Sequence, residues 1–545
     1  MNKLNIQIIG MTCNHCALSA EDALNSLDGV KASVSYDEGL AKVETQSNID
    51  NSLLLKTIES KGYGAILLDD NGNESTGGGG KSLHIAIVGT GSGAFAAAIK
   101  AVEQGAHVTI IEGADIIGGT CVNIGCVPSK IMIRGAYIAH IQGRHNFDGL
   151  PFNRPVIDRK AMVRQQQEWV ENLRYAKYES ILESNPGINL LRGMARFKDV
   201  STLVITEKNG SEKEIKADRI LLAVGARPMI PDIKGLEGTP YWTSTEALIA
   251  EAVPKHLVVL GGSVVALELA QAFRHIGSEV TMMARSTLLS KDDVDIGKGL
   301  KSVLEDEGVV VRLNTVPENI SHDGKHFAIS IGQGIVYCDQ LLVATGRRSN
   351  ADTLALDNAG IAVAENGVIV IDDHMRTNVE YIYAAGDCTN QPQYVYVAAA
   401  AGTRAARNMT GENVAIDLST MPAVVFTDPQ VATVGLNEQQ AIKQGLTVET
   451  SKLDLENVPR ALANMDTRGF IKLVAEKETG RIIGCQVLAH EGGEIIQTAT
   501  LAISNRMTIE SLANQLFPYL TMVEGLKLTA QTFNKDVKQL SCCAG

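Results

Sequence analysis

The chain has 545 residues, too many for one hydrophobic core, so three or four domains are expected. Its net charge of −13 argues against nonspecific binding to nucleic acid and to anionic membranes. Because no apolar run reaches the roughly 20 residues that cross a bilayer and the N-terminus lacks the pattern of a signal peptide, we expect a cytoplasmic protein without membrane insertion.

Residues 1–68 are predicted to form a small module with the element order βαββαβ. The segments LNIQIIG, GVKASVSY, LAKVET and AILL have the pattern of strands, and ALSAEDALNSL and NSLLLKTIESKG that of amphipathic helices. This order indicates an α+β sandwich of the ferredoxin-like kind. Residues 69–82 are polar and Gly-rich without apolar periodicity, so we expect a flexible linker there.

A thiol pair lies on the loop before the first helix of this module. Cys13 and Cys16 are spaced so that two sulfurs can converge on one soft ion. A C-x-x-C pair alone could also be a thioredoxin-like redox motif. The stretch GMTCNHC on a βαββαβ module resembles heavy-metal-associated domains, and this resemblance implies that both cysteines bind a metal ion, mercury or copper. His15, between them, is expected to point to solvent.

The next segment, IAIVGTGSGAFAAAIKAVEQGAHVTIIE, predicts the strand, helix and strand of a dinucleotide-binding unit. Gly89 permits the tight turn, Gly91 lets a pyrophosphate approach the backbone, and the small Ala94 lets the helix pack on the sheet. Glu112 ends the second strand, where it can accept hydrogen bonds from a ribose. The agreement of strand, helix and distal acid favours a dinucleotide site over a Gly-rich structural turn.

A second thiol pair follows in GGTCVNIGCVPSK. Helix N-terminal amides and a nearby cation lower the pKa of a thiol, and the thiolate is the reactive form. Cys121 and Cys126 therefore form a candidate redox pair, with Lys130, one turn beyond, as the cation. Many cysteines are only small buried hydrophobes. The Gly118-Gly119 pair and the surrounding dinucleotide fold favour the redox interpretation here.

The segment LVVLGGSVVALELAQAFRHIGSEVTMMARS repeats the dinucleotide-binding unit. Its small residues are Gly261, Ser263 and Ala266. Ala284 stands where the first unit has its acid, and Arg285 follows. Because a carboxylate would repel a 2′-phosphate and an arginine attracts one, NADPH is favoured over NADH. The alternative is that this arginine is only a solvated surface charge.

Three more strands are predicted at 219–226, 340–347 and 382–387, and a mixed pattern from Met421 predicts a terminal α+β domain. Both fingerprints, the C-x₄-C stretch and IYAAGDC resemble the pyridine nucleotide–disulfide oxidoreductase family (class I) over about residues 82–545. The resemblance implies FAD at the first site, a homodimer with shared active sites, Cys126 as the charge-transfer thiolate and Cys121 as the interchange thiol. The further cofactor contacts implied are Gly119, Thr120, Lys130 and Asp387 for FAD and Glu268 for NADPH.

The expected fold class is α/β, with two Rossmann-like dinucleotide-binding domains and an α+β dimerisation domain after the ferredoxin-like metal-binding domain. The expected boundaries are 1–68 for the heavy-metal-associated domain, 69–82 for the linker, 83–230 and 351–420 for the two parts of the FAD-binding domain, 231–350 for the NADPH-binding domain and 421–545 for the dimerisation domain.

The C-terminal region departs from the pattern of disulfide-reducing family members. Those members carry a His-Pro-Thr-x-x-Glu stretch whose histidine protonates the departing thiolate, whereas this chain has Phe517 before Pro518. A phenyl ring carries no proton, so general-acid catalysis worth roughly 10²–10⁴-fold would be absent. Cys542 and Cys543 are adjacent, which disfavours a disulfide and suits a soft metal ion. An incidental pair or a lipidation signal is the alternative, although no C-a-a-X box is present.

The three thiol pairs together resemble the mercury(II)-reducing branch of the family. This resemblance implies that Hg(II)–thiol complexes are the substrate, that Cys542 and Cys543 pass Hg(II) to Cys121 and Cys126, and that Tyr178 and Tyr519 help to position the ion. Without the resemblance, core packing is the natural role for both tyrosines. The alternatives are a dihydrolipoamide or glutathione-type disulfide reductase with an accessory metal module, and a copper-handling binding protein.

Overall fold

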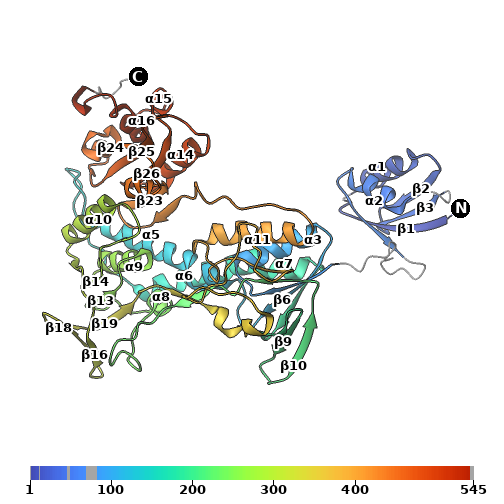
Figure 1. The fold of residues 1–545 in the computed structure, drawn as a ribbon, viewed down its shortest axis with the longest axis horizontal. Coiled ribbons are helices and arrows are strands. Elements are labelled where there is room, and N and C mark those ends of the chain that lie inside the picture. The colour runs from blue at the N-terminus through green and yellow to red at the C-terminus, as the bar shows by residue number, and fades with distance from the viewer. Residues whose placement is uncertain (1, 12, 46–48, 69–82, 540–545) are drawn as a thin grey trace. The chain divides into compact units, whose positions relative to one another are not determined.

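The computed structural model describes residues 2–11, 13–45, 49–68 and 83–539 (Figure 1). The expected linker 69–82 and the thiols Cys542 and Cys543 lie outside these residues. The chain divides into two compact units, residues 1–82 and 83–545. Within the described part of the chain, no helix is both long and apolar enough to cross a membrane.

The first unit has the predicted βαββαβ order. Its antiparallel sheet has the strand order β2-β3-β1-β4 and carries two helices. The elements are β1 (Asn2–Ile9), α1 (Asn14–Asn25), β2 (Val30–Ser35), β3 (Leu40–Thr45), α2 (Asn51–Glu59) and β4 (Gly64–Leu68). Alternate strand residues such as Ile6 pack against helix residues such as Leu24 and Ile58, so that one face of the sheet is buried.

The second unit begins with a parallel sheet of strand order β7-β6-β5-β11-β21. Its strands are β5 (His84–Val88), β6 (His107–Glu112), β7 (Ile188–Arg192), β11 (Arg219–Leu222) and β21 (Ile382–Ala384). The helices α3 (Ser92–Glu103) and α11 (Val395–Met409) pack closely on each other. A Cβ at Gly402 would lie 2.0 Å from the carbonyl oxygen of Gly93, so only glycine permits this approach.

A second parallel sheet, of order β15-β14-β13-β19, repeats the arrangement, so the predicted duplication of the dinucleotide-binding unit is confirmed. Its elements are β13 (His256–Leu260), α9 (Val264–His275), β14 (Glu279–Met283), α10 (Val294–Asp306), β15 (Val310–Arg312) and β19 (Gln340–Val343). The predicted strands at 219–226 and 340–347 are shorter than expected, because Gly225 and Gly346, both with positive φ, lie beyond the strand ends.

Two antiparallel sheets that the sequence analysis did not predict accompany the parallel ones. They are β10-β9-β8 and β16-β17-β18, built from β8 (Met194–Asp199), β9 (Thr202–Thr206), β10 (Glu212–Lys216), β16 (Asn319–His322), β17 (Phe327–Ile331) and β18 (Gly334–Cys338). The chain passes from the first dinucleotide-binding domain to the second and back again. The two connecting segments pair with each other as the antiparallel strands β12 (Ala226–Pro228) and β20 (Arg347–Ser349).

The terminal α+β domain is a five-stranded antiparallel sheet of order β22-β23-β26-β25-β24 with helices on it (Figure 1). Its elements are β22 (Ala423–Val425), β23 (Gln430–Gly435), α12 (Glu438–Lys443), β24 (Val448–Asp454), α13 (Pro459–Ala463), β25 (Phe470–Glu476), β26 (Ile482–Ala489), α14 (Gly492–Ser504), α15 (Ile509–Ala513) and α16 (Glu524–Gln531). Its apolar core includes Leu473, Val487 and Leu526.

Candidate active site

Cys121 and Cys126 are held on two consecutive helices joined by one residue. Cys121 lies in α4 (Gly119–Ile124), and Cys126 is the first residue of α5 (Cys126–Gly143). Gly125 connects the helices, and a Cβ there would lie 2.8 Å from the carbonyl oxygen of Thr120. The tight connection therefore requires glycine, and it brings the two thiols into hydrogen-bonding contact.

The two thiols are electrostatically unequal. The Cys121 thiol donates a hydrogen bond to the Cys126 sulfur, and this bond, helped by the positive charge of Lys130, lowers the pKa of Cys126 to about 7 against the opposing effect of burial. The same hydrogen bond, together with burial, raises the pKa of Cys121. Cys126 is therefore the thiolate and Cys121 the protonated partner in the resting pair.

Lys130 is held in place by a buried acid from the second dinucleotide-binding domain. Its ammonium lies 2.8 Å from Glu268 Oε2, and the ion pair is flanked by the Phe426 ring, whose centroid is 4.6 Å from the Lys130 nitrogen. Glu268 is 5% exposed, and its other oxygen accepts the Phe426 backbone N–H at 2.9 Å. The position of the cation beside the thiols thus depends on contacts from two other segments that are far from it in the sequence.

The cysteine helix lies directly against the first glycine fingerprint. A Cβ on Gly119 would lie 2.6 Å from the Gly91 Cα, so this approach also requires glycine. Thr90 links the two features, because its hydroxyl donates to the Glu112 carboxylate and accepts the Gly118 N–H at 3.2 Å. Anything bound along the fingerprint therefore lies next to the helix that carries Cys121.

Each glycine fingerprint forms a tight backbone turn that leads into the N-terminus of a helix. Gly89 has φ +110°, and a Cβ there would lie 2.4 Å from the Ala223 carbonyl oxygen. Gly91 is the N-cap of α3 and would meet no atom within 4 Å if it carried a Cβ, so the space above it is open. Ala94, in the first turn of α3, is fully buried. Free amides and open space at a helix start suit a pyrophosphate.

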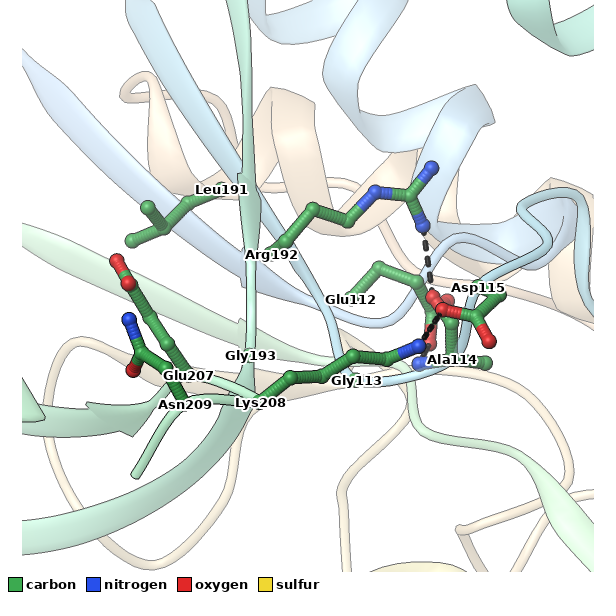
Figure 2. A pocket seen from close by; sticks show the side chains of 10 residues that line it. All are labelled: Glu112, Gly113, Ala114, Asp115, Leu191, Arg192, Gly193, Glu207, Lys208 and Asn209. Carbon is green, nitrogen blue, oxygen red and sulfur yellow. Dashed lines mark hydrogen bonds and ion pairs between the residues drawn. The ribbon is translucent and has the colours of Figure 1, made fainter. Parts of the chain in front are cut away.

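A cavity of about 480 Å³ adjoins the end of β6, and Glu112, the last residue of that strand, lines it (Figure 2). Figure 2 shows its side chains coming from β6, from β7 and from the turn between β9 and β10, with Lys208 paired to Asp115. Glu112 accepts the Ala114 N–H at 2.8 Å. The cavity lies at the carboxyl end of the second strand, where the acid of such a sheet can hydrogen-bond a ribose.

The second fingerprint repeats this geometry, except that a serine replaces the middle glycine. Gly261 has φ +138°, and a Cβ there would lie 2.2 Å from the Ala344 carbonyl oxygen and 3.0 Å from the buried Ala266. Ser263 is the N-cap of α9. Arg285 is exposed just beyond the end of β14.

Tyr178 lies beside the thiols, although sequence spacing alone did not indicate it. It belongs to a π-helix (Tyr175–Glu179), its hydroxyl is 3.2 Å from Ser92 Oγ, and its ring contacts Phe95 edge to face at 4.9 Å. Burial, and then the two nearby cysteines, raise its pKa against the effect of Ser92, so it stays a neutral hydroxyl at pH 7. A Cβ at Gly118 would lie 3.3 Å from its ring.

The other predicted site residues that the structure describes are Asp387, Phe517 and Tyr519. Asp387 follows β21, and burial raises its pKa despite Arg347, whose Nε lies 3.4 Å from its carboxylate. Phe517 is half-buried against the core of the terminal domain. Tyr519 is 53% exposed between α15 and α16.

The thiol pair of the first unit lies at the start of α1. Cys13 is the N-cap residue, and its Sγ is 3.6 Å from that of Cys16. His15 is exposed, as predicted. A hydrogen bond with Cys16 raises the pKa of Tyr63, a contact that sequence spacing did not reveal. Two sulfurs at this distance can bind one soft ion.

Comparison with known proteins agrees with this geometry. The pyridine nucleotide-disulphide oxidoreductase profile matches residues 83–402, the dimerisation domain of that family matches 421–530, and the heavy-metal-associated domain matches 5–64. Mercuric reductases from Shewanella putrefaciens and Shigella flexneri are each 54% identical to this chain, over 99% of it and 100% of the relative. The chain belongs to the mercuric reductase family.

Among solved structures, the copper(II) complex of the HOCl-induced flavoprotein disulfide reductase RclA from Escherichia coli has a TM-score of 0.75 and 28% identity, over 83% of this chain and 100% of that chain. Membership of the mercuric reductase family makes this chain an oxidoreductase with a dimerisation domain. Sequence reasoning missed Thr90 and Ser92, which occupy two of the three variable positions of the first fingerprint; a hydroxyl residue at each is the only signal that marks them.

Proposed function

We propose that this enzyme reduces Hg(II) to Hg(0) with electrons from NADPH, passed through FAD to a metal ion held by Cys121 and Cys126. The observation that carries the proposal is the unequal thiol pair: Cys126 is poised as a thiolate near neutral pH, and Cys121 lies in hydrogen-bonding contact with it. Two sulfurs in contact form a ligand pair for a soft cation, and mercuric reductases are the relatives that match the whole chain.

The residues that would hold the cofactors fit them. FAD would bind along Gly89, Gly91 and Ala94, with its ribose at Glu112, and the flavin would reach the thiols where Gly119 approaches Gly91. The further contacts proposed for FAD are Thr120, Lys130 and Asp387, and those proposed for NADPH are Gly261, Ser263, Ala266, Glu268 and Arg285. Bound FAD would accept hydride from NADPH and supply two electrons to the thiol-bound ion.

The balance of the reaction requires no disulfide. Hg(II) arrives with two thiolate ligands, which exchange for the sulfurs of the enzyme, and two electrons with one proton come from NADPH. With a second proton from solvent, the products are Hg(0), NADP⁺ and two released thiols. Lys130, fixed by Glu268, stabilises the negative charge of the thiolate site throughout. Tyr178, with its neutral hydroxyl beside both sulfurs, is proposed to position the ion.

The terminal domain favours mercury over a disulfide substrate. Phe517, half-buried among apolar side chains, has no proton to give a leaving thiolate, whereas thiolate exchange on Hg(II) needs no such donor. We propose that Cys542 and Cys543 deliver Hg(II), helped by Tyr519, to the thiols of the partner subunit in a homodimer with shared active sites. The Cys13–Cys16 pair would supply the ion to them.

The assay that tests the proposal measures NADPH oxidation by the FAD-loaded protein with Hg(II) in excess thiol, together with the release of mercury vapour. Glutathione disulfide and lipoamide serve as alternative substrates. We expect Hg(II)-dependent turnover that Cys121→Ser or Cys126→Ser each abolish. Cys485→Ser is the matched control and should keep activity, because Cys485 is buried in the terminal domain and is not proposed to bind the ion. Turnover of the disulfides alone would refute the proposal.

A further inference from the structure

A second constellation of metal-ligating side chains lies away from the thiols. His140 is near the end of α5, His275 is the last residue of α9, and Glu307 follows α10. Because α5 begins at Cys126, fourteen residues before His140, the cluster lies about 21 Å along the helix axis from that cysteine. None of the thiol chemistry uses it.

The ligand atoms of the three residues converge. His275 Nε2 is 3.0 Å from Glu307 Oε2, His140 Nε2 is 4.0 Å from Glu307 Oε1, and one ligand atom from each residue lies within 4.8 Å of the others. The two imidazole rings stack with centroids 3.8 Å apart, so their in-plane lone pairs meet at one ion only after the His140 ring turns out of the stack. A four-coordinate Zn²⁺ holds such ligands at about 2.0–2.2 Å, so their atoms lie about 3.3 Å apart. The His140 side chain has to move most when an ion binds, because its Nε2 lies farther from the carboxylate than that of His275.

The charges around the cluster favour a cation. The guanidinium nitrogens of Arg468 contact three carboxylates. The distances to their oxygens are 3.0 Å for Glu307, 2.9 Å for Asp428 and 2.7 Å for Asp466. Arg274 adds a second guanidinium, whose Nε donates to the Glu307 backbone oxygen at 2.7 Å. Three carboxylates against these two arginines leave one negative charge in excess, in a site where the Glu307 side chain is fully buried. Arg144 lies near His140 but at the exposed edge, where solvent screens it.

The histidines can supply lone pairs. Burial, and then the neighbouring His275, lower the pKa of His140 to about 4, so its imidazole is neutral at pH 7 and its ring nitrogen is free to act as a ligand. The His140 side chain is 17% exposed, whereas that of His275 is 3% exposed. An ion can therefore enter past His140, and water can complete its coordination.

We propose that His140, His275 and Glu307 form a binding site for one borderline divalent cation of the Zn²⁺ class. Two imidazoles and a carboxylate suit such ions, whereas a softer ion prefers the thiolates elsewhere in the chain. The ion takes Glu307 Oε2 and His275 Nε2 in place of the hydrogen bond between them, with the His275 proton moving to its other ring nitrogen. Arg468 keeps Glu307 Oε1 and orients the carboxylate.

Gln271 completes the surroundings, since its side-chain amide donates to Glu307 Oε2 at 3.0 Å and to the Asp428 carbonyl oxygen at 2.8 Å. The bound ion would join the flavin-domain helix α5 to α9 and to the end of α10, tying together the two dinucleotide-binding domains. Another cluster, at Asp372, Asp373 and His374, is built from consecutive residues of one turn and is more exposed. It provides a comparison for the test.

The experiment compares zinc binding by the full-length FAD-loaded protein and two single variants under reducing conditions. His140→Phe keeps the ring stack on His275 but removes the ligand, and His374→Phe makes the same change in the exposed cluster. Because the thiols are identical in all three proteins, the difference in bound Zn²⁺ reports this site. We expect one ion fewer per subunit in H140F, or a dissociation constant raised roughly tenfold or more, and no change in H374F.

Anomalous diffraction at the zinc edge from crystals of the unmodified protein locates the ion independently of any variant. A peak between His140, His275 and Glu307 supports the site. Equal zinc content in the unmodified protein and H140F, a loss confined to H374F, or zinc peaks only at cysteines would each overturn the proposal.

Discussion

At the residue scale, two cysteines five positions apart differ because their surroundings differ. Cys126 starts a helix, accepts a hydrogen bond from Cys121 and lies near Lys130, so its pKa falls to about 7. Below that pH the thiol is protonated and loses its affinity for Hg(II), so capture should weaken as pH falls through about 7. Replacing the cation in Lys130→Met should move the midpoint of thiolate formation upward.

This prediction is checked by following the ultraviolet absorbance of the thiolate, or its alkylation rate, against pH. Lys100→Met is the matched control, since Lys100 pairs with the exposed Glu103 on α3 and has no contact with the thiols. The control should keep the midpoint of the unmodified protein. If K130M titrates at the same pH as K100M, the electrostatic role of Lys130 is wrong.

At the scale of elements, the first fingerprint turn depends on glycine for two separate reasons. Gly89 has a positive φ, and its Cβ would also lie 2.4 Å from the backbone oxygen of Ala223 on the neighbouring chain segment. Gly105, in the turn after α3, has φ +83° but open space around it. We expect Gly89→Ala to lower stability by more than the about 1–3 kcal/mol typical of backbone strain alone, with loss of FAD.

Thermal unfolding and the ratio of bound flavin to protein measure this effect. Gly105→Ala carries the conformational cost without the collision, so the difference between the two variants isolates the collision. Equal melting temperatures and equal flavin content would show that the sheet absorbs the added methyl group, contrary to expectation.

The repeated units could be predicted from sequence because buried parallel strands are uninterrupted apolar runs and their glycine turns have fixed spacing. The π-helix that carries Tyr178 could not, because its sequence YAKYE is as compatible with an ordinary α-helix. Likewise, the contact of Lys130 with Glu268 joins positions 138 residues apart, and no local pattern encodes it. The sheets β10-β9-β8 and β16-β17-β18 were missed because their strands are short and the edge strands β10 and β18 are largely exposed.

At the scale of the whole molecule, the chain consists of two compact units, and every residue proposed above to hold FAD or NADPH, like the inner thiol pair, belongs to residues 83–545. The first unit has its own hydrophobic core, and so does the second. We therefore expect the truncated protein to fold, bind FAD and keep most of its steady-state Hg(II) reduction in excess small thiol.

The contribution of the first unit should show only when Hg(II) is scarce. A tethered thiol pair raises the local concentration of the ion's donor, so the full chain should outpace the truncated one at substoichiometric Hg(II) with little free thiol. Cys13→Ser with Cys16→Ser in the full chain is the matched control, because it keeps the tether and removes only the ligands. If this double variant behaves like the unmodified chain while the truncation is slow, the first unit acts through its bulk and not through its thiols.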